Sequence, residues 1–140
     1  MKPKRDLHTP NDVDFLVNTF YERVRSDVML GPVFNERIQP DAWPVHLERM
    51  TQFWSNLLFA IPGYKGSPLL KHIGLPVGAE HFERWLELWE STVNDHFEGD
   101  VAMAALTKAR NIAEVFQEKL LNNTFQVVPL TDTNHAQRSL

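Results

Sequence analysis

Apolar residues recur every three or four positions in four stretches of this chain, over residues 11–24, 41–61, 79–97 and 100–120. This spacing places them on one face of an α-helix, whose period is 3.6 residues. A half-buried strand would instead alternate apolar and polar residues, and no such alternation of useful length occurs. The pattern therefore predicts an all-α fold built on four long helices, without internal repeats.

The ends of the predicted helices carry capping and breaking residues. Asn11, Asp41 and Asp100 can each cap a first turn, because their side chains accept hydrogen bonds from unpaired backbone N–H groups. Residues 30–35, Leu-Gly-Pro-Val-Phe-Asn, predict a compact corner after the first helix. We therefore assign one domain to residues 11–122, with a flexible N-terminal arm at 1–10 and a disordered C-terminal tail at 123–140.

The interval 62–77 differs from the rest of the chain, because it carries little regular pattern between two long helices. It holds a short helix-like element that ends with His72 and is bounded by Gly66, Gly74 and Pro76. One interpretation is that this histidine has no chemical role and merely stabilises the end of a helix through the helix dipole. The alternative is that it presents one nitrogen ligand to a buried group. The element alone favours the first interpretation, stabilisation of a helix end.

The composition narrows the classes of function. A net charge of −4 argues against nucleic-acid and anionic-membrane surfaces, which need clustered Lys and Arg. No run of about 18 apolar residues could span a membrane, and no apolar signal segment follows Met1. The chain has no Cys, which excludes disulfides, iron–sulfur ligation and thioether attachment of a cofactor. These features fit a cytoplasmic protein.

Metal sites of helical bundles are the first chemistry to test. Di-iron carboxylate bundles place Glu three residues before a ligating His, but no acidic residue stands three positions before His46, His72, His81 or His96. The His-x₃-His spacing of a zinc site, a nucleophile motif and a Gly-rich phosphate loop are also missing. What remains is His46 and His72, each among apolar residues in a different element.

A single axial histidine facing a large aromatic cavity is an arrangement that holds haem. The residues expected to line such a cavity are Phe34, Met50, Phe53, Phe82, Trp85 and Phe116. Pattern alone favours a simpler interpretation of these six, an ordinary helical core. Tyr21 and Trp85 are more informative, because each carries a hydrogen-bond donor that needs a partner when it is buried.

Six short motifs follow one another along the chain. They are Phe20-Tyr21-Glu22, Leu30-Gly31-Pro32-Val33-Phe34, Trp43-x-x-His46, Phe53-Trp54, Gly66-Ser67-Pro68-Leu69-Leu70-Lys71-His72-x-x-Leu75-Pro76 and Phe82-x-x-Trp85. In the order and spacing of these motifs the chain resembles the truncated haemoglobins, most closely the third of their three main groups, which is found in bacteria. The resemblance covers roughly residues 11–122. The Gly-Gly pairs of the first two groups are absent, which fits the third.

The resemblance implies a two-over-two helical globin that holds haem b without a covalent bond. His72 matches the axial ligand of the haem iron, and Tyr21, His46 and Trp85 match the residues on the opposite, distal side. Phe34 matches an aromatic residue that packs on the haem.

Two basic residues complete the expected pocket. Arg49 and Lys71 lie where members of the family contact the haem propionates, and charge-assisted hydrogen bonds to a carboxylate suit both. An equally good interpretation is that they are ordinary exposed basic side chains.

The resemblance also implies a function, the binding of O₂, CO and NO at a penta-coordinate haem iron. Two donors, Tyr21 O–H and Trp85 N–H, would slow the release of O₂ from a low-dielectric pocket, which suits redox or detoxification chemistry better than storage. His46 can line the pocket, gate it or act as an acid or base on peroxide. The alternatives are a haem peroxidase or NO-detoxifying enzyme with a reductase partner, and a haem-free helical sensor or interaction domain.

Overall fold

The computed structural model describes residues 4–64 and 77–121 of the 140-residue chain. The element expected around His72 and the tail at 123–140 lie outside the described residues. The described helices are α1 (Pro10–Ser26), α2 (Leu30–Arg37), the 3₁₀ turn η1 (Pro40–Ala42), α3 (Trp43–Phe59), α5 (Ala79–His96) and α6 (Asp100–Leu121). None of these helices is long and apolar enough to cross a membrane.

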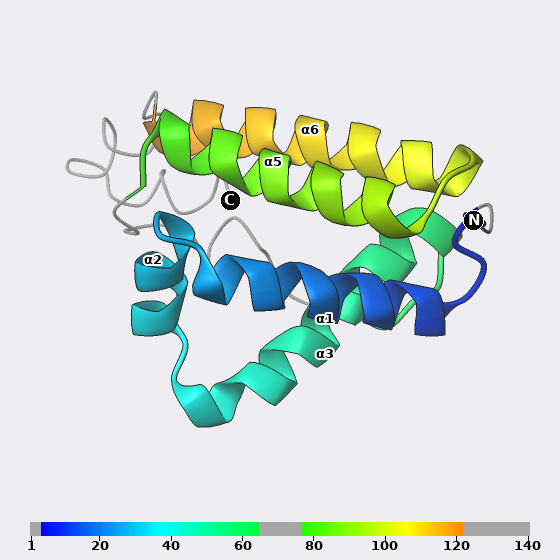
Figure 1. Ribbon diagram of the computed structural model, residues 1–140, viewed down its shortest axis with the longest axis horizontal. Helices are drawn as coiled ribbons and strands as arrows, with labels where there is room; N and C mark the ends of the chain where they lie inside the picture. The colour runs from blue at the N-terminus through cyan, green and yellow to red at the C-terminus, as the bar shows by residue number, and fades with distance from the viewer. Residues whose placement is uncertain (1–3, 65–76, 122–140) are drawn as a thin grey trace, which may run out of the picture.

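The long helices form two layers, each made of two helices (Figure 1). In one layer α1 packs across α3, and in the other α5 and α6 run side by side in opposite directions. α1 also lies against α5, which joins the layers, and the short α2 sits at one end of α1. Over the described ranges the only strand-like feature is one isolated backbone bridge, so the all-α, two-over-two prediction is confirmed.

The core between the layers is built on large aromatic side chains. The rings of Trp54 on α3 and Trp89 on α5 stack with their centroids 4.4 Å apart, and Phe20 on α1 meets Trp89 edge-on at 5.0 Å. The indole N–H of the fully buried Trp89 donates to the backbone carbonyl of Ala105 at 3.1 Å. α6 approaches this closely because it turns a row of buried alanines toward the core.

Residues 4–9 pack against the helices and do not form the flexible arm predicted from the sequence. Leu7 is 1% exposed and belongs to the core. The Asp6 carboxylate accepts the backbone N–H groups of Val101 and Ala102, both at 2.8 Å, and thereby caps the start of α6. The prediction that Asp100 caps this helix is therefore wrong. Its cap comes from a residue 95 positions away from Val101, which no local pattern can indicate.

The ends of the other helices lie closer to their predicted positions. α1 begins at Pro10 with Thr9 as its cap, two residues before the predicted cap Asn11. The corner predicted at 30–35 is itself part of a helix, α2. α3 carries Pro44 in its first turn, where a missing N–H costs no hydrogen bond.

Candidate functional site

A cavity lies between the two layers, and all five described α-helices contribute to its wall. The described side chains that line it are Tyr21, Leu30, Val33, Phe34, Met50, Phe53, Trp54, Val77, His81, Phe82, Trp85, Ile112, Ala113 and Phe116. Its empty space, including the open mouth, is about 800 Å³. Most of the lining is apolar and much of it is aromatic, so the cavity suits a large, flat, apolar ligand.

The structure brings together most of the residues singled out from the sequence. Seven of them line this one cavity: Tyr21, Phe34, Met50, Phe53, Phe82, Trp85 and Phe116. They come from α1, α2, α3, α5 and α6, so only the packing of the helices makes them neighbours. His46 and Arg49 are not part of the described lining. Lys71 and His72 lie outside the described residues.

Tyr21 occupies a nest of aromatic rings at the junction of α1, α2 and α3. It is 7% exposed, and its ring centroid lies 5.9 Å from that of Phe34 and 5.8 Å from that of Trp43. The ring of His46 meets it edge-on at 5.1 Å. Burial raises the pKa of the Tyr21 phenol, because the phenolate would lose its hydration. Tyr21 therefore stays protonated at neutral pH and keeps an O–H donor in the cavity wall.

Trp85 contributes a second donor, the indole N–H, from α5. Its ring meets Phe20 edge-on at 5.9 Å and lies parallel to Trp89, with an interplanar angle of 4° and centroids 6.3 Å apart. These two contacts fix the plane of the indole, while the side chain is half-buried and lines the cavity. The wall thus holds two donors on different helices, α1 and α5.

Arg49 is exposed on α3. Its charge acts on the phenol of Tyr64, where burial raises the pKa and Arg49 opposes that rise. The Tyr64 ring in turn contacts Phe53, which lines the cavity, at 5.2 Å. Tyr64 thus links the charge of Arg49 to a ring of the cavity wall, although neither Arg49 nor Tyr64 belongs to the described lining.

One polar residue of the cavity, His81 in the first turn of α5, was not predicted from the sequence. Its Nδ1 accepts a hydrogen bond from the backbone N–H of Gly78 at 2.9 Å, so the neutral ring carries its proton on Nε2. The half-buried ring thus offers a donor to an acidic ligand group. The sequence signal for this contact was the position of His81 three residues after Gly78, which precedes the predicted helix. The sequence also did not single out three apolar lining residues, Leu30, Val33 and Ile112. Apolar residues recur at the same helical spacing whether they line a cavity or fill a core.

The donor set fits a prosthetic group that needs few protein ligands. Over residues 4–64 and 77–121, no group of three or more His, Cys, Asp or Glu side chains could hold a metal ion. The cavity instead combines aromatic walls with a few donors, those of Tyr21, Trp85 and His81, and this combination fits a flat apolar ring system carrying its own metal.

Two paired helical layers around an aromatic cavity are the architecture of a truncated globin. No protein-family model matches the chain. It is 38% identical over 108 residues to the group 3 truncated hemoglobin ctb of Campylobacter jejuni, across 75% of this chain and 85% of that protein. It also matches the crystal structure of the group III truncated hemoglobin from Campylobacter jejuni, with a TM-score of 0.78 and 35% identity over 84% of this chain and 95% of that one.

The chain therefore belongs to the group 3 truncated haemoglobins. This confirms the family inferred from the six sequence motifs. Membership of this family implies a haem cofactor and the binding of small gaseous ligands.

Proposed function

We propose that the cavity holds haem b without a covalent bond and that the protein binds O₂, CO and NO there, for redox or detoxification chemistry rather than O₂ storage. The observation that carries this proposal is the gathering of seven predicted residues on one apolar cavity wall. Haem, when bound, supplies an iron atom that takes diatomic ligands and exchanges electrons with them. The chain has no Cys, so it cannot form thioether bonds to the ring.

The chain's own residues would hold this group from several sides. His72 would bind the iron as a neutral imidazole, with its other nitrogen donating a hydrogen bond that raises its basicity. The aromatic and aliphatic wall would cover both faces of the ring. Arg49 and Lys71 would pair with the propionates by charge-assisted hydrogen bonds.

On the distal side, Tyr21 and Trp85 would hold the diatomic ligand. Each offers a donor in a largely apolar wall, and hydrogen bonds are stronger in such a low-dielectric place. Burial raises the pKa of Tyr21, so its proton remains available at neutral pH. Two donors aimed at a ligand that gains negative charge would slow its release. Slow release is a disadvantage for O₂ delivery and an advantage for chemistry on the ligand.

A second candidate function is that of a peroxidase or NO-detoxifying enzyme that receives electrons from a reductase. It is favoured by His46, whose ring lies edge-on to Tyr21 and whose imidazole is a side chain that serves as general acid or base in catalysis. Peroxidase turnover that falls in His46→Ala, with haem content unchanged, would support this role. The net charge of −4 argues against a nucleic-acid partner, and the absence of Cys fits a cytoplasmic protein.

The test of the main proposal is spectroscopic. The purified protein, supplied with haem, should show a Soret band that shifts on adding CO. A colourless protein that takes up no added haem would instead support the remaining alternative, a haem-free helical sensor or interaction domain.

A further inference from the structure

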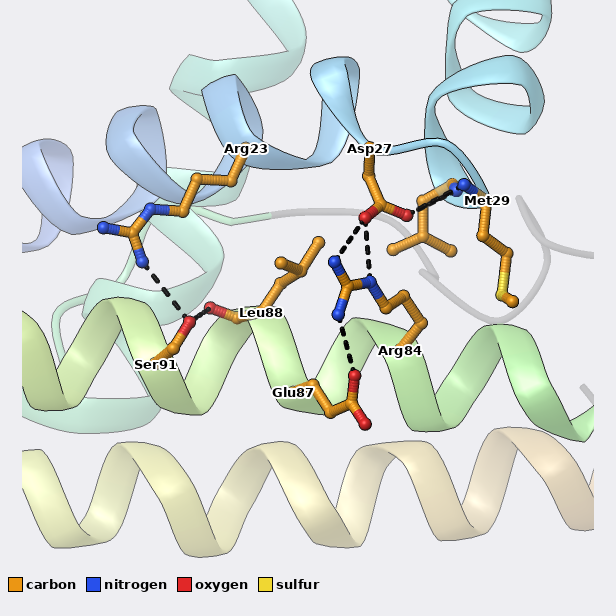
Figure 2. Close-up of polar contacts among 8 residues, drawn as sticks. Arg23, Asp27, Met29, Arg84, Glu87, Leu88 and Ser91 are labelled. Carbon is orange, nitrogen blue, oxygen red and sulfur yellow. Dashed lines mark hydrogen bonds and ion pairs between the residues drawn. The ribbon is translucent and has the colours of Figure 1, made fainter.

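A buried carboxylate joins three helices beside the cavity (Figure 2). Asp27 follows the last residue of α1, and its side chain is 5% exposed. Its Oδ2 accepts the backbone N–H groups of Met29 at 3.0 Å and Leu30 at 2.9 Å, at the start of α2. Its Oδ1 faces Arg84 of α5, with Nε at 2.8 Å and a terminal guanidinium nitrogen at 2.7 Å. One side chain thus ties α1, α2 and α5 together.

The residues next to this junction belong to the cavity wall. Leu30, whose N–H is held by Asp27, lines the cavity, and so does Trp85, the neighbour of Arg84. Tyr21 lies on α1, six positions before Asp27. The junction therefore sits between the part of the wall that carries Tyr21 and the part that carries Trp85.

The chemistry of the junction makes it rigid. Two guanidinium nitrogens of Arg84 meet one oxygen of Asp27, and such charge-assisted contacts are about twice as strong as neutral hydrogen bonds. Burial of Asp27 opposes ionisation, but hydrogen bonds from Arg84, Leu30 and Met29 outweigh it and hold the pKa of this carboxyl below its usual range. Asp27 is therefore charged at neutral pH, and loss of Arg84 would leave a buried charge with only the backbone donors as partners.

We propose that the Asp27–Arg84 pair is a positioning device that sets how the Tyr21 side of the cavity faces the Trp85 side, and through it the rate at which a diatomic ligand leaves. The part concerning the ligand rests on the proposed haem function. The pair does not touch the cavity itself, since neither residue belongs to its described lining. It acts through Leu30 and Trp85.

The same two helices offer a matched control, the ion pair of Arg23 on α1 with Asp95 on α5, at 3.0 Å. Its side chains are 34% and 55% exposed, and Arg23 also donates to the hydroxyls of Ser91 and Thr92. This pair neither caps α2 nor adjoins a residue of the described cavity lining. Asp95→Asn therefore removes an α1–α5 ion pair without disturbing the junction.

The first experiment needs no haem. Indole N–H resonances of ¹⁵N-labelled protein are compared in wild type, Asp27→Asn, Arg84→Gln, the double variant and Asp95→Asn, with the Trp85 signal identified by Trp85→Phe. Asparagine keeps an oxygen for the N–H groups of α2, so it removes the ion pair and keeps the cap. The Trp85 signal should move in both single variants and no further in the double variant, because they break one interaction.

Two resonance patterns would overturn the proposal. The first is an unmoved Trp85 signal in both single variants, and the second is an equal movement in Asp95→Asn. The Trp89 signal serves as an internal reference, since its N–H is held by Ala105 and should stay in place. Arg84→Gln alters a half-exposed side chain and carries the test alone if Asp27→Asn does not fold.

The second experiment uses the haem-loaded protein. O₂ should dissociate roughly 2- to 10-fold faster in Asp27→Asn and Arg84→Gln, the size expected when one hydrogen bond is weakened. Asp95→Asn should keep the wild-type rate, and in a Trp85→Phe background the two variants should add little further. Unchanged O₂ rates in both variants would contradict the link to the ligand. A protein that takes up no haem would refute the proposed function, while the indole resonances would still decide on the pair.

Discussion

Trp85 and Trp89 stand one turn apart on α5, with nearly parallel rings, yet they belong to two different regions of the molecule. Trp89 is fully buried, stacked on Trp54, and its N–H is bonded to the carbonyl of Ala105. Trp85 is half-buried and lines the cavity. The same residue type on one face of one helix thus serves a closed core in one case and an open site in the other.

The difference between the two regions lies in what faces each indole from the other helices. Opposite Trp89, α6 presents alanines, which let its backbone come close enough to accept the indole N–H. Nearer the cavity, α6 presents Ile112, Ala113 and Phe116, which line the empty space together with residues of α3 and α5. The backbone of α6 thus closes the core at Trp89, while side chains of the same helix face the empty space nearer Trp85.

The largest effect is expected from His72→Ala, at the residue proposed as the axial ligand. Because no other residue is assigned as an axial ligand, this variant should lose stable haem uptake and its Soret band. Far-UV circular dichroism should remain helical, since the closed region keeps its packing. Free imidazole added to the variant should restore the band, and His8→Ala, on an exposed residue, should leave it intact. Normal haem retention in His72→Ala would disprove the assignment.

The closed region should respond most strongly to Trp89→Ala. Removing a fully buried indole loses its stacking on Trp54 and leaves a cavity, which typically costs about 3–5 kcal/mol in free energy of unfolding. The same truncation of the half-buried Trp85 should cost clearly less. Urea unfolding of both variants measures the contrast. Equal losses of stability would remove the distinction drawn between the two regions.

The reverse contrast is expected for ligand release. Trp85→Phe keeps most of the ring contacts but removes the N–H, a change worth on the order of 1–3 kcal/mol if that group bonds the ligand, so O₂ should dissociate several-fold faster. Trp89→Phe should leave the O₂ rate near that of wild type, because its N–H serves the backbone of α6. Stopped-flow measurement of O₂ dissociation compares the two, and an unchanged rate in Trp85→Phe would count against its role.

The smallest effect is expected on stability at low pH, from an ion pair between the N-terminal segment and α1. Hydrogen bonds from Arg5, helped by the backbone N–H groups of His8 and Thr9, lower the pKa of Asp12 from 3.8 to about 2. A carboxyl with a lowered folded-state pKa contributes stability that is complete above the unfolded pKa. This contribution should disappear as the pH falls from about 4 to about 2.

The matched variant for this prediction is Asp12→Asn, which cannot ionise. Its free energy of unfolding should change less than that of wild type between about pH 4 and about pH 2. Urea unfolding at several pH values in this window gives the comparison. Parallel curves for the two proteins would show that Asp12 does not contribute to the acid dependence.

Much of the fold follows from local pattern. The stripe that includes Phe82, Trp89 and Val93 predicts α5 closely, because residues three and four apart must share a helix face. Pro44 in the first turn of α3 is equally predictable, since it removes an N–H that needs no partner there. The packing of the N-terminal segment was not predictable, because Asp6 can cap α6 only when the start of that helix lies beside it.

The candidate site divides in the same way. Tyr21 and Trp85 were found as donors on apolar helix faces, and the structure places both on one cavity wall. His81 was not predicted as a lining residue, because only the packing of the layers decides that the first turn of α5 faces the cavity. His46 lies beside Tyr21 and outside the described lining, and its role stays a prediction.

The sequence by itself determined the amphipathic helices, the exclusion of thiolate chemistry and the ordered motifs that indicate the family. These depend on local geometry and on residue chemistry, which the order of residues specifies directly. The tertiary structure alone decided which indole closes the core and which lines the cavity, where α6 finds its cap, and that Asp27 meets Arg84. Such partners are distant in the chain, and only the packing of the two helical layers brings them within hydrogen-bond distance.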